Sequence, residues 1–308
     1  MIVSLLPEAG GKIAELSDRR TGRNWLWQNP HLPVRPAIYA ADYGRELDSG
    51  GWDEILFSTD PCDVELLDGR RRAVPDHGDL VGQPWKVLAA GVDESGRAAC
   101  DLAVTGRAFA YDWRRVVTLD AERPVLTLQY SLRNSGDIAW PWLWCAHPLI
   151  AVERGMRIEL PNDRAFRVTQ TTLPRIDQPP AELRWPRLPL SDGSEVDLGA
   201  SFAGAHEPRR FAAKVFVESR SPGEIYLHSV HNSERLTFRY DASEIPWTGL
   251  WINNEAWSGC GSQAYLNLGV EPSTSSCDSL TAAIAEGQAD WLEPEEVRTW
   301  SLRVEVRA

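Results

Sequence analysis

The chain has 308 residues, of which 43% are hydrophobic and 25% charged, a composition typical of a folded globular protein. Its formal net charge of −12 disfavours binding to nucleic acid or to anionic membrane surfaces, because their phosphate groups repel an acidic protein. No apolar run approaches the roughly 20 residues that cross a bilayer, and the five cysteines form no CxxC pair. We therefore expect a cytoplasmic protein with reduced thiols, no metal site and no membrane partner.

The first predicted elements are β-strands. MIVSLLPEAGGKIAEL, residues 1–16, has no basic start and only a short apolar stretch, so it predicts a strand and a turn rather than a secretion signal. Residues 114–136 hold two short runs around the turn DAERP. In the second run Leu126, Leu128 and Tyr130 share one face and polar residues share the other, which predicts a β-hairpin.

Strand signals continue to the end of the chain. Residues 213–241 repeat the alternating pattern with turns at SPGE and NSE, and TWSLRVEVRA predicts a last strand. Residues 172–199 are rich in proline and polar residues and predict an ordered excursion or loop. The best helical signal is STSSCDSLTAAIAEG, in which Ser or Thr caps a short run of Ala and Leu. We expect one domain over residues 1–308, an all-β fold built as a large antiparallel β-sandwich.

Three residues stand in settings suited to acid–base chemistry. His77 lies in the turn-like segment PDHGDLVGQPW, and His147 ends a run with three tryptophans. Glu271 ends an apolar strand, and Pro272 after it favours an edge or rim of the sheet, where ladder pairing stops. A glutamate beside histidines forms a general acid–base pair. The alternatives are histidines buried in the core and a glutamate in solvent, and sequence spacing alone does not decide between them.

Six segments resemble, in order and over nearly the whole chain, the aldose 1-epimerase (galactose mutarotase) superfamily in its mutarotase-related branch. They are GGKIAELSDRRTGRNWLWQNP, GGWDEILFSTDPC, DHGDLVGQPW, WCAHPLIAVERGMRIELP, LGVEPSTSSCDSL and WLEPEEVRTWSLRVEV. The resemblance implies a galactose mutarotase-like supersandwich that interconverts the anomers of a sugar by general acid–base catalysis. It implies no cofactor, a small-molecule sugar as substrate, and a monomer or homodimer. The absence of a glycine-rich dinucleotide fingerprint agrees with chemistry that needs no nicotinamide.

The resemblance also implies roles for individual residues. Glu271 matches the general base that acts on the anomeric hydroxyl, and His147 matches the acid that protonates the ring oxygen. His77 matches the first histidine of the family, which holds the sugar. The chain departs from the family pattern after His77, where an expected arginine is missing. Asp53 and Glu54 stand in GWDE instead, so we expect Asp53 among the sugar contacts.

Aromatic and amide side chains are the further candidates for binding sugar. Trp occurs 14 times, and its flat apolar face with one N–H suits a sugar ring. The candidates for this platform are Trp52, Trp85, Trp251 and Trp257. Asn253 offers an amide donor and acceptor to sugar hydroxyls. The alternatives are that the tryptophans fill the core and that Asn253 shapes a turn.

Two other functions on the same fold stay open at this point. One is a non-catalytic carbohydrate-binding protein that keeps the cleft without turnover. The other is a different carbohydrate enzyme, a lyase or a hydrolase. The missing arginine favours both, because it changes the contacts to the sugar.

Overall fold

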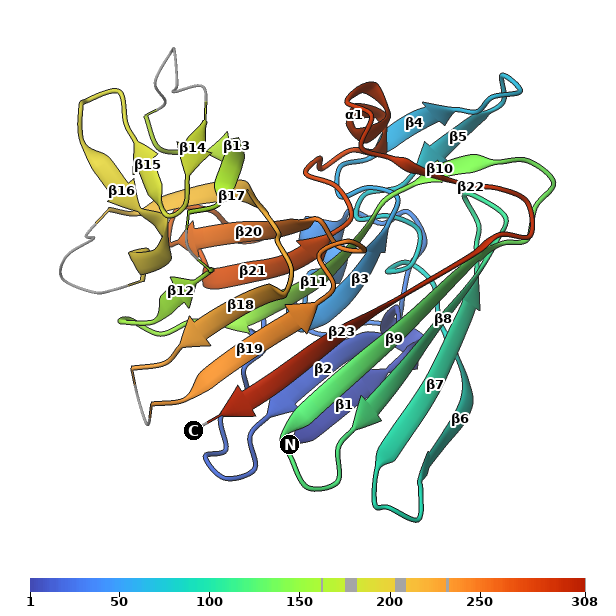
Figure 1. Ribbon diagram of the computed structural model, residues 1–308, viewed down its shortest axis with the longest axis horizontal. Coiled ribbons are helices and arrows are strands. Elements are labelled where there is room, and N and C mark those ends of the chain that lie inside the picture. Colours follow the sequence, from blue (N-terminus) through green and yellow to red (C-terminus); the bar gives the residue numbers. More distant parts are fainter. Residues whose placement is uncertain (162, 175–181, 203–208, 231–232, 308) are drawn as a thin grey trace.

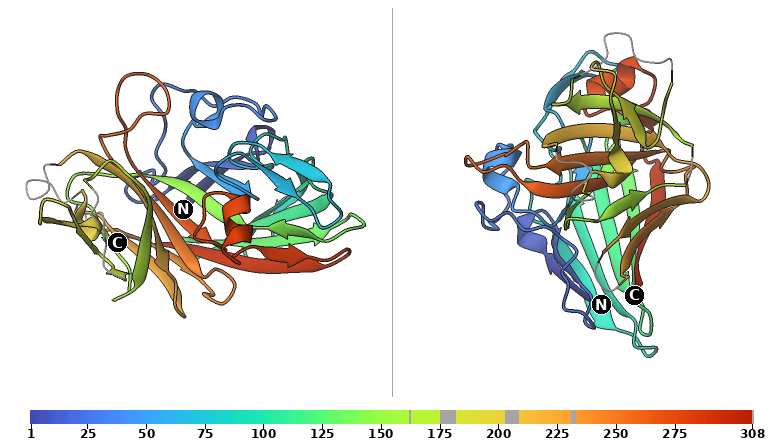
Figure 2. Two further views of the ribbon diagram at one scale, coloured as in Figure 1. Left: turned by 90° about the horizontal axis from the view of Figure 1, so that it is seen from above. Right: turned by 90° about the vertical axis from the view of Figure 1, so that its left-hand side faces the viewer.

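Two large antiparallel sheets make up most of the protein. The computed structural model describes residues 1–161, 163–174, 182–202, 209–230 and 233–307. Within these residues one sheet has nine strands and the other eight, and the strand pairs of both are antiparallel. The sheets lie against each other as two layers (Figure 1 and Figure 2). The predicted all-β antiparallel sandwich is confirmed.

The nine-stranded sheet has the strand order β1-β2-β3-β11-β21-β20-β17-β13-β14. Its strands are β1 (Ile2–Leu6), β2 (Lys12–Ser17), β3 (Trp52–Leu56), β11 (Trp144–Ala151), β21 (Leu266–Ser273), β20 (Trp247–Asn254), β17 (Phe211–Glu218), β13 (Ala165–Thr171) and β14 (Leu183–Arg184). The eight-stranded sheet has the order β12-β18-β19-β23-β9-β8-β7-β6. Its strands are β12 (Arg157–Glu159), β18 (Gly223–His228), β19 (Arg235–Tyr240), β23 (Val297–Arg307), β9 (Val125–Asn134), β8 (Tyr111–Leu119), β7 (Ala98–Thr105) and β6 (Lys86–Val92).

Short elements complete the described part of the chain. Two-stranded ribbons join β4 (Cys62–Glu65) to β5 (Arg71–Val74), β10 (Trp140–Trp142) to β22 (Asp290–Leu292) and β15 (Arg187–Pro189) to β16 (Glu195–Asp197). The helical turns are η1 (Pro7–Ala9), η2 (Tyr43–Leu47), η3 (Leu198–Ala200) and α1 (Leu280–Ala285). None of the helices among the described residues has the length and apolarity needed to cross a membrane.

The predictions that rested on local patterns agree with these elements. β8 and β9 form the predicted hairpin, and Leu126, Leu128 and Tyr130 are all buried. The predicted helix is α1, with Ser279 as its N-cap. The last strand, β23, pairs with β9 and β19 in the middle of the eight-stranded sheet.

Two expectations need correction, and a third is refined. The turn SPGE does not close a hairpin, because β17 belongs to the nine-stranded sheet and β18 to the eight-stranded one. The expected ordered excursion at residues 172–199 carries the short strands β14, β15 and β16, and residues 175–181 lie outside the described part. Pro272 lies within a central strand, opposite Thr248 of β20, and not at a rim. The turn NSE, by contrast, joins β18 to β19 as expected, with Asn232 outside the described residues.

Alternation along β3 decides which side chains enter the space between the sheets. Successive side chains of a strand point to opposite faces. Trp52 is fully buried, and its ring packs against Phe238 of β19, with centroids 5.9 Å apart. Asp53 therefore faces the other side of the sheet, where it binds Lys12 and Tyr43.

Glu54 shares the inward face with Trp52 and belongs to the core. Its carboxylate lies 3.1 Å from the guanidinium of Arg115, and both side chains have no exposed surface. Tyr130 and Trp144 donate further hydrogen bonds to the same carboxylate. Burial nevertheless raises the pKa of Glu54 to about 7. This cluster ties the two sheets together, so Glu54 is not a contact for sugar.

Candidate functional site

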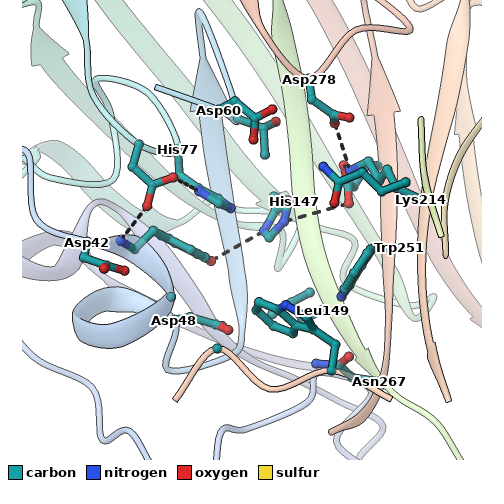
Figure 3. A pocket seen from close by; sticks show the side chains of 18 of the residues that line it. Asp42, Asp48, Asp60, His77, His147, Leu149, Lys214, Trp251, Asn267 and Asp278 are labelled. Carbon is teal, nitrogen blue, oxygen red and sulfur yellow. Dashed lines mark hydrogen bonds and ion pairs between the residues drawn. The ribbon is translucent and has the colours of Figure 1, made fainter. Parts of the chain in front are cut away.

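A cavity of about 440 Å³ lies on the outward face of the nine-stranded sheet. Its floor comes from β11, β17, β20 and β21, and its walls come from the loops around residues 42–48, 59–60, 76–78 and 257–259. Figure 3 shows side chains from these segments pointing toward a shared centre. Five of the residues expected at the site line it: Glu271, His147, His77, Trp251 and Trp257.

Glu271 and His147 face each other from adjacent strands. Cys145 pairs with Ser273 and Leu149 with Gly269, so the register of β11 and β21 sets His147 beside Glu271. Nε2 of His147 lies 3.8 Å from Oε1 of Glu271 (Figure 3). Glu271 has no exposed surface and His147 is 6% exposed. Two titratable groups thus lie close together in the cavity with almost no exposure to solvent.

Lys214 balances the charge of Glu271. Its ammonium group donates a hydrogen bond to Oε2 of Glu271 and lies 3.7 Å from Asp278. Burial acts to lower the pKa of Lys214, but the charges of Glu271 and Asp278 outweigh it and hold that pKa above its ordinary value. The lysine therefore stays protonated, and the buried carboxylate keeps a cation in contact.

The other carboxylate oxygen of Glu271 is available. Among the described residues Oε1 has no hydrogen-bond partner, although it is buried. A methyl group added at Gly269 would come within 2.8 Å of this oxygen, and one added at Gly249 within 3.1 Å of the Cβ of Glu271. Glycine at these two positions keeps space open around the carboxylate. An unpaired buried acceptor with free space beside it is suited to a ligand hydroxyl.

His147 is held in its neutral form. Burial lowers its pKa well below the ordinary value of 6.5, and the nearby positive charges of His77 and Lys214 lower it further. Nδ1 lies 3.5 Å from the hydroxyl oxygen of Tyr43. The carboxylate of Glu271 opposite Nε2 favours the tautomer with its proton on Nε2, because that proton faces a negative charge. The hydroxyl proton of Tyr43 goes to Asp53, and its oxygen lies 3.5 Å from Nδ1, too far for a strong hydrogen bond, so we assign the proton to Nε2 on the charge of Glu271.

Behind His147 a chain of contacts fixes its surroundings. Tyr43 donates a hydrogen bond of 2.8 Å to Asp53, and Lys12 lies 2.6 Å from the same carboxylate oxygen. Burial and the neighbouring carboxylates raise the pKa of Tyr43 well above its usual range, so its hydroxyl keeps its proton. Asp53 thus supports the site through Tyr43 and does not line the cavity.

His77 forms one wall of the cavity. Its ring stacks on Tyr43, with centroids 3.7 Å apart and planes inclined by 7°, and meets the ring of His147 edge to face. Asp76 lies 2.8 Å from Nδ1 of His77. The backbone of His77 has a φ of +56°, in the left-handed region that side chains with a Cβ adopt at a cost. Such strain gathers at functional sites, where the surrounding structure holds it in place.

Trp251 and Trp257 provide apolar faces at the mouth of the cavity. Their rings meet at 89° with centroids 5.5 Å apart. Trp257 is 40% exposed, in the loop after β20, and Trp251 is half-buried. Asn253 is bound within the protein instead, because its amide donates to the backbone oxygen of Trp257 and accepts from two backbone N–H groups of the same loop. It shapes the loop that carries Trp257 and does not line the cavity.

Trp52 and Trp85 lie in the core, away from the cavity. Trp52 points inward because it alternates with Asp53 on β3. Trp85 is 3% exposed, packs near Trp113 of β8 and donates a hydrogen bond to the backbone oxygen of Leu80. Neither ring has a face that a sugar in this cavity could contact. Trp52 and Trp85 therefore fill the core between the sheets, which was the alternative to binding sugar.

Sequence reasoning missed Lys214, Tyr43 and Asp278. A signal for the lysine existed: the chain has only three lysines, and Lys214 interrupts the apolar run FAAKVFVE. A charged side chain in such a strand needs a buried partner. Tyr43 and Asp278 lie in a helical turn and a loop and carry no comparable signal. Within the described residues no three His, Cys, Asp or Glu side chains are placed to hold a metal ion together.

Solved structures of other proteins share this fold. A galactose mutarotase-like protein from Clostridium acetobutylicum aligns with a TM-score of 0.68 and 14% identity, over 99% of this chain and 92% of its own. A candidate aldose 1-epimerase from Klebsiella pneumoniae aligns with a TM-score of 0.69 and 12% identity, over 99% and 76%. A galactose mutarotase related enzyme from Lactobacillus acidophilus aligns with a TM-score of 0.61 and 12% identity, over 99% and 94%.

This chain therefore has the galactose mutarotase-like fold that its sequence resemblance implied. No protein-family model and no curated protein matches the sequence. At such low identity the structural likeness establishes the fold alone, and function has to be argued from the site.

Proposed function

We propose that this protein is a carbohydrate epimerase that interconverts the two anomers of an aldose. Glu271 is the general base and His147 the general acid. One observation carries the proposal: the free oxygen Oε1 of Glu271 lies 3.8 Å from Nε2 of His147 in a cavity of about 440 Å³. A hemiacetal presents a hydroxyl and a ring oxygen on the same carbon, and these two groups are suited to receive that pair.

The reaction needs two proton transfers and no redox change. Glu271 removes the proton of the anomeric hydroxyl, and the carbonyl forms as the bond between C1 and the ring oxygen breaks. The ring oxygen takes the proton from Nε2 of His147, which is left as an imidazolate until ring closure returns the proton. After rotation about the bond between C1 and C2, the same steps run backwards on the other face of the aldehyde. Both residues return to their starting states, so the protons and electrons balance.

A neutral imidazole is adequate for the acid role. The ring oxygen gains negative charge as its bond to C1 breaks, and it is then a strong acceptor for the proton on Nε2. Enzymes elsewhere use a neutral histidine with a lowered pKa as the electrophile in this way. The stack of His77 on Tyr43 and the contact of Tyr43 with Nδ1 hold the ring of His147 in place.

The ion pair at Glu271 favours a second candidate. Lys214 occupies Oε2 of the carboxylate, so only Oε1 is left to take up a proton. A non-catalytic carbohydrate-binding protein would tolerate this loss, since binding needs only the acceptor and the aromatic faces. The lyase and hydrolase alternatives gain no comparable support.

The site of action and the partners follow from the same reasoning. We place the activity in the cytoplasm, where the five cysteines, all free thiols, would stay reduced. The substrate is a small-molecule sugar, and the chain acts as a monomer or homodimer.

Polarimetry and NMR exchange test the proposal. The purified protein is added to freshly dissolved α-anomers of several aldoses, and the approach to anomeric equilibrium is followed. We expect acceleration, and a loss of about 10²- to 10⁴-fold in Glu271→Gln, the usual contribution of one well-placed proton-transfer group. Glu94→Gln is the matched control, because Glu94 is exposed and distant from the cavity.

Sugar binding without any change in the rate of equilibration would favour the binding protein. An unsaturated product that absorbs in the ultraviolet would favour a lyase. Equal activity of Glu271→Gln and the unchanged protein would overturn the assignment of the base.

A further inference from the structure

The cavity around Glu271 is acidic. Among the described residues that line it, six side chains are carboxylates, against one lysine and one arginine. The carboxylates are Asp42, Asp48, Asp60, Asp76, Glu271 and Asp278. His147 adds no positive charge, because it is held neutral, and His77, the other histidine of the lining, is paired with Asp76 at 2.8 Å. A ligand entering this cavity meets an excess of negative charge.

Neither the lysine nor the arginine of the lining presents a free charge inside the cavity. Lys214 is held by Glu271 and Asp278. Arg45 points into solvent, with 78% of its side chain exposed, and its nearest acid is Asp42 at 3.7 Å. Proteins meet phosphate groups with free arginine, lysine or backbone N–H groups. The cavity offers no such cluster among its described residues, so a phosphorylated sugar is disfavoured.

The unpaired groups of the cavity are hydrogen-bond acceptors. Oε1 of Glu271 and Oδ1 of Asn267 are buried and have no partner among the described residues. Asn267, Gly269 and Glu271 alternate on one face of β21, so both acceptors belong to the same cavity wall. Buried acceptors without donors cost free energy. A ligand rich in donors would remove that cost, whereas a phosphate brings only further acceptors.

Asp48 adds a further carboxylate acceptor to the cavity. It is 4% exposed, lines the cavity, and its carboxylate points toward the centre in Figure 3. The one hydrogen bond that its carboxylate accepts from the described residues comes from the backbone N–H of Gly50 to Oδ1, at 3.4 Å. Lys12, the cation that most affects it, is already bound to Asp53, and His77, the next, is paired with Asp76. Burial raises the pKa of Asp48 to about 6, although the charges of Lys12 and His77 act to lower it.

On these observations, which deepen the proposed epimerase function, we propose that the substrate is an unphosphorylated aldose that carries a protonated amine. The ammonium group binds Asp48, and the hydroxyls of the sugar satisfy Asn267 and Glu271. An ammonium group bound to a carboxylate makes a bond roughly twice as strong as that of a neutral hydroxyl. The net attraction of the remaining carboxylates adds to this preference.

Binding to the unchanged protein is the first test. Calorimetry or NMR titration compares glucosamine and 6-amino-6-deoxyglucose with glucose, N-acetylglucosamine and glucose 6-phosphate. We expect at least one amino sugar to bind about tenfold or more tightly than glucose, the effect of 1.4 kcal/mol. N-acetylglucosamine keeps the nitrogen without its charge and should lose the advantage. Glucose 6-phosphate should bind most weakly.

Substitution of Asp48 is the second test. Asp48→Asn keeps the shape and removes the charge, so the advantage of the amino sugar over glucose should vanish while glucose still binds. Asp42→Asn is the matched control, because it removes one charge at the exposed rim of the same cavity. Circular dichroism of each variant shows whether it is folded. The comparison of sugars on the unchanged protein tests the inference even if a variant does not fold.

Three results would overturn the inference. They are tighter binding of glucose 6-phosphate than of either amino sugar, equal affinity for glucosamine, N-acetylglucosamine and glucose, and an undiminished preference in Asp48→Asn. Faster anomer exchange of neutral sugars together with any of these would leave the epimerase function standing. Absence of both binding and exchange for every sugar would end both proposals.

Discussion

Nε2 of His147 lies 3.8 Å from Oε1 of Glu271, and each residue belongs to a central strand of the nine-stranded sheet. This distance exceeds that of a hydrogen bond. Because Oε2 is held by Lys214, the free oxygen of the carboxylate is the one that faces the imidazole. Under the proposed function, the pair acts on a ligand group that contacts both side chains from the cavity.

Removing Lys214 should destabilise the protein. In Lys214→Met the carboxylate of Glu271 stays buried without the cation that contacts it. Breaking a buried ion pair from one side typically costs about 3–5 kcal/mol, so we expect the free energy of unfolding at pH 7 to fall by that amount. Urea unfolding measures it. Adding Glu271→Gln should restore part of the loss, and a double variant as unstable as Lys214→Met would contradict the pairing.

Gly269→Ala should lower activity. The added methyl would lie 2.8 Å from Oε1 of Glu271 and 3.0 Å from the Cβ of Trp251, so it would occupy the space that the substrate needs. We expect kcat/KM to fall at least about tenfold, equivalent to 1.4 kcal/mol of lost transition-state stabilisation. The control is Gly91→Ala on β6, where a methyl group meets no atom within 4 Å. Equal activity of the two variants would show that this space is not used.

The lowered pKa of His147 predicts a dependence of stability on pH. Between the folded-state pKa of His147 and its ordinary value of 6.5, the unfolded chain binds the proton and the folded chain does not. The contribution of His147 to the free energy of unfolding therefore rises with pH through this window and is lost as pH falls below about 6.5. Urea unfolding between pH 5 and 8 measures this contribution as the difference between the unchanged protein and His147→Gln.

The difference is needed because other groups act with the opposite sign. The folded-state pKa values of Asp48 and Glu54 are raised to about 6 and about 7. Their contributions to the free energy of unfolding fall as pH rises toward those values. Because Asp48 and Glu54 are present in both proteins, their contributions cancel in the difference between the two free energies of unfolding. A difference that does not change with pH would mean that His147 is not held neutral.

Two tryptophans should respond in opposite ways. Trp257→Ala removes a ring that is 40% exposed at the mouth of the cavity, so KM for the sugar should rise about tenfold, equivalent to 1.4 kcal/mol of lost binding, with little change in stability. Trp85→Ala empties a buried site and should lower the free energy of unfolding by about 3–5 kcal/mol. Sugar titration and urea unfolding of both variants separate the two effects. Unchanged sugar affinity in Trp257→Ala would remove this ring from the site.

Several features of the fold could be read from the sequence because they depend on neighbouring residues. Leu126, Leu128 and Tyr130 repeat with the period of a strand, and this period together with the turn DAERP predicted the hairpin of β8 and β9. The same period implied that Trp52 and Asp53 point to opposite faces. It did not say which face is the core, because that depends on where the second sheet packs. In the structure Trp52 packs against Phe238 of β19, so its face of the sheet is the core.

Which residues line the cavity together was decided by the tertiary structure. Three motifs of the sequence pointed to Glu271, His147 and His77, and their resemblance to a family suggested one site for them. Lys214 and Asp48 carried no such motif, and they meet the others only because β17 and the loop before β3 fold onto the same face of the sheet. The periodicity of a strand is a short-range property of the chain, whereas the partners of a buried charge are chosen by the packing of distant segments.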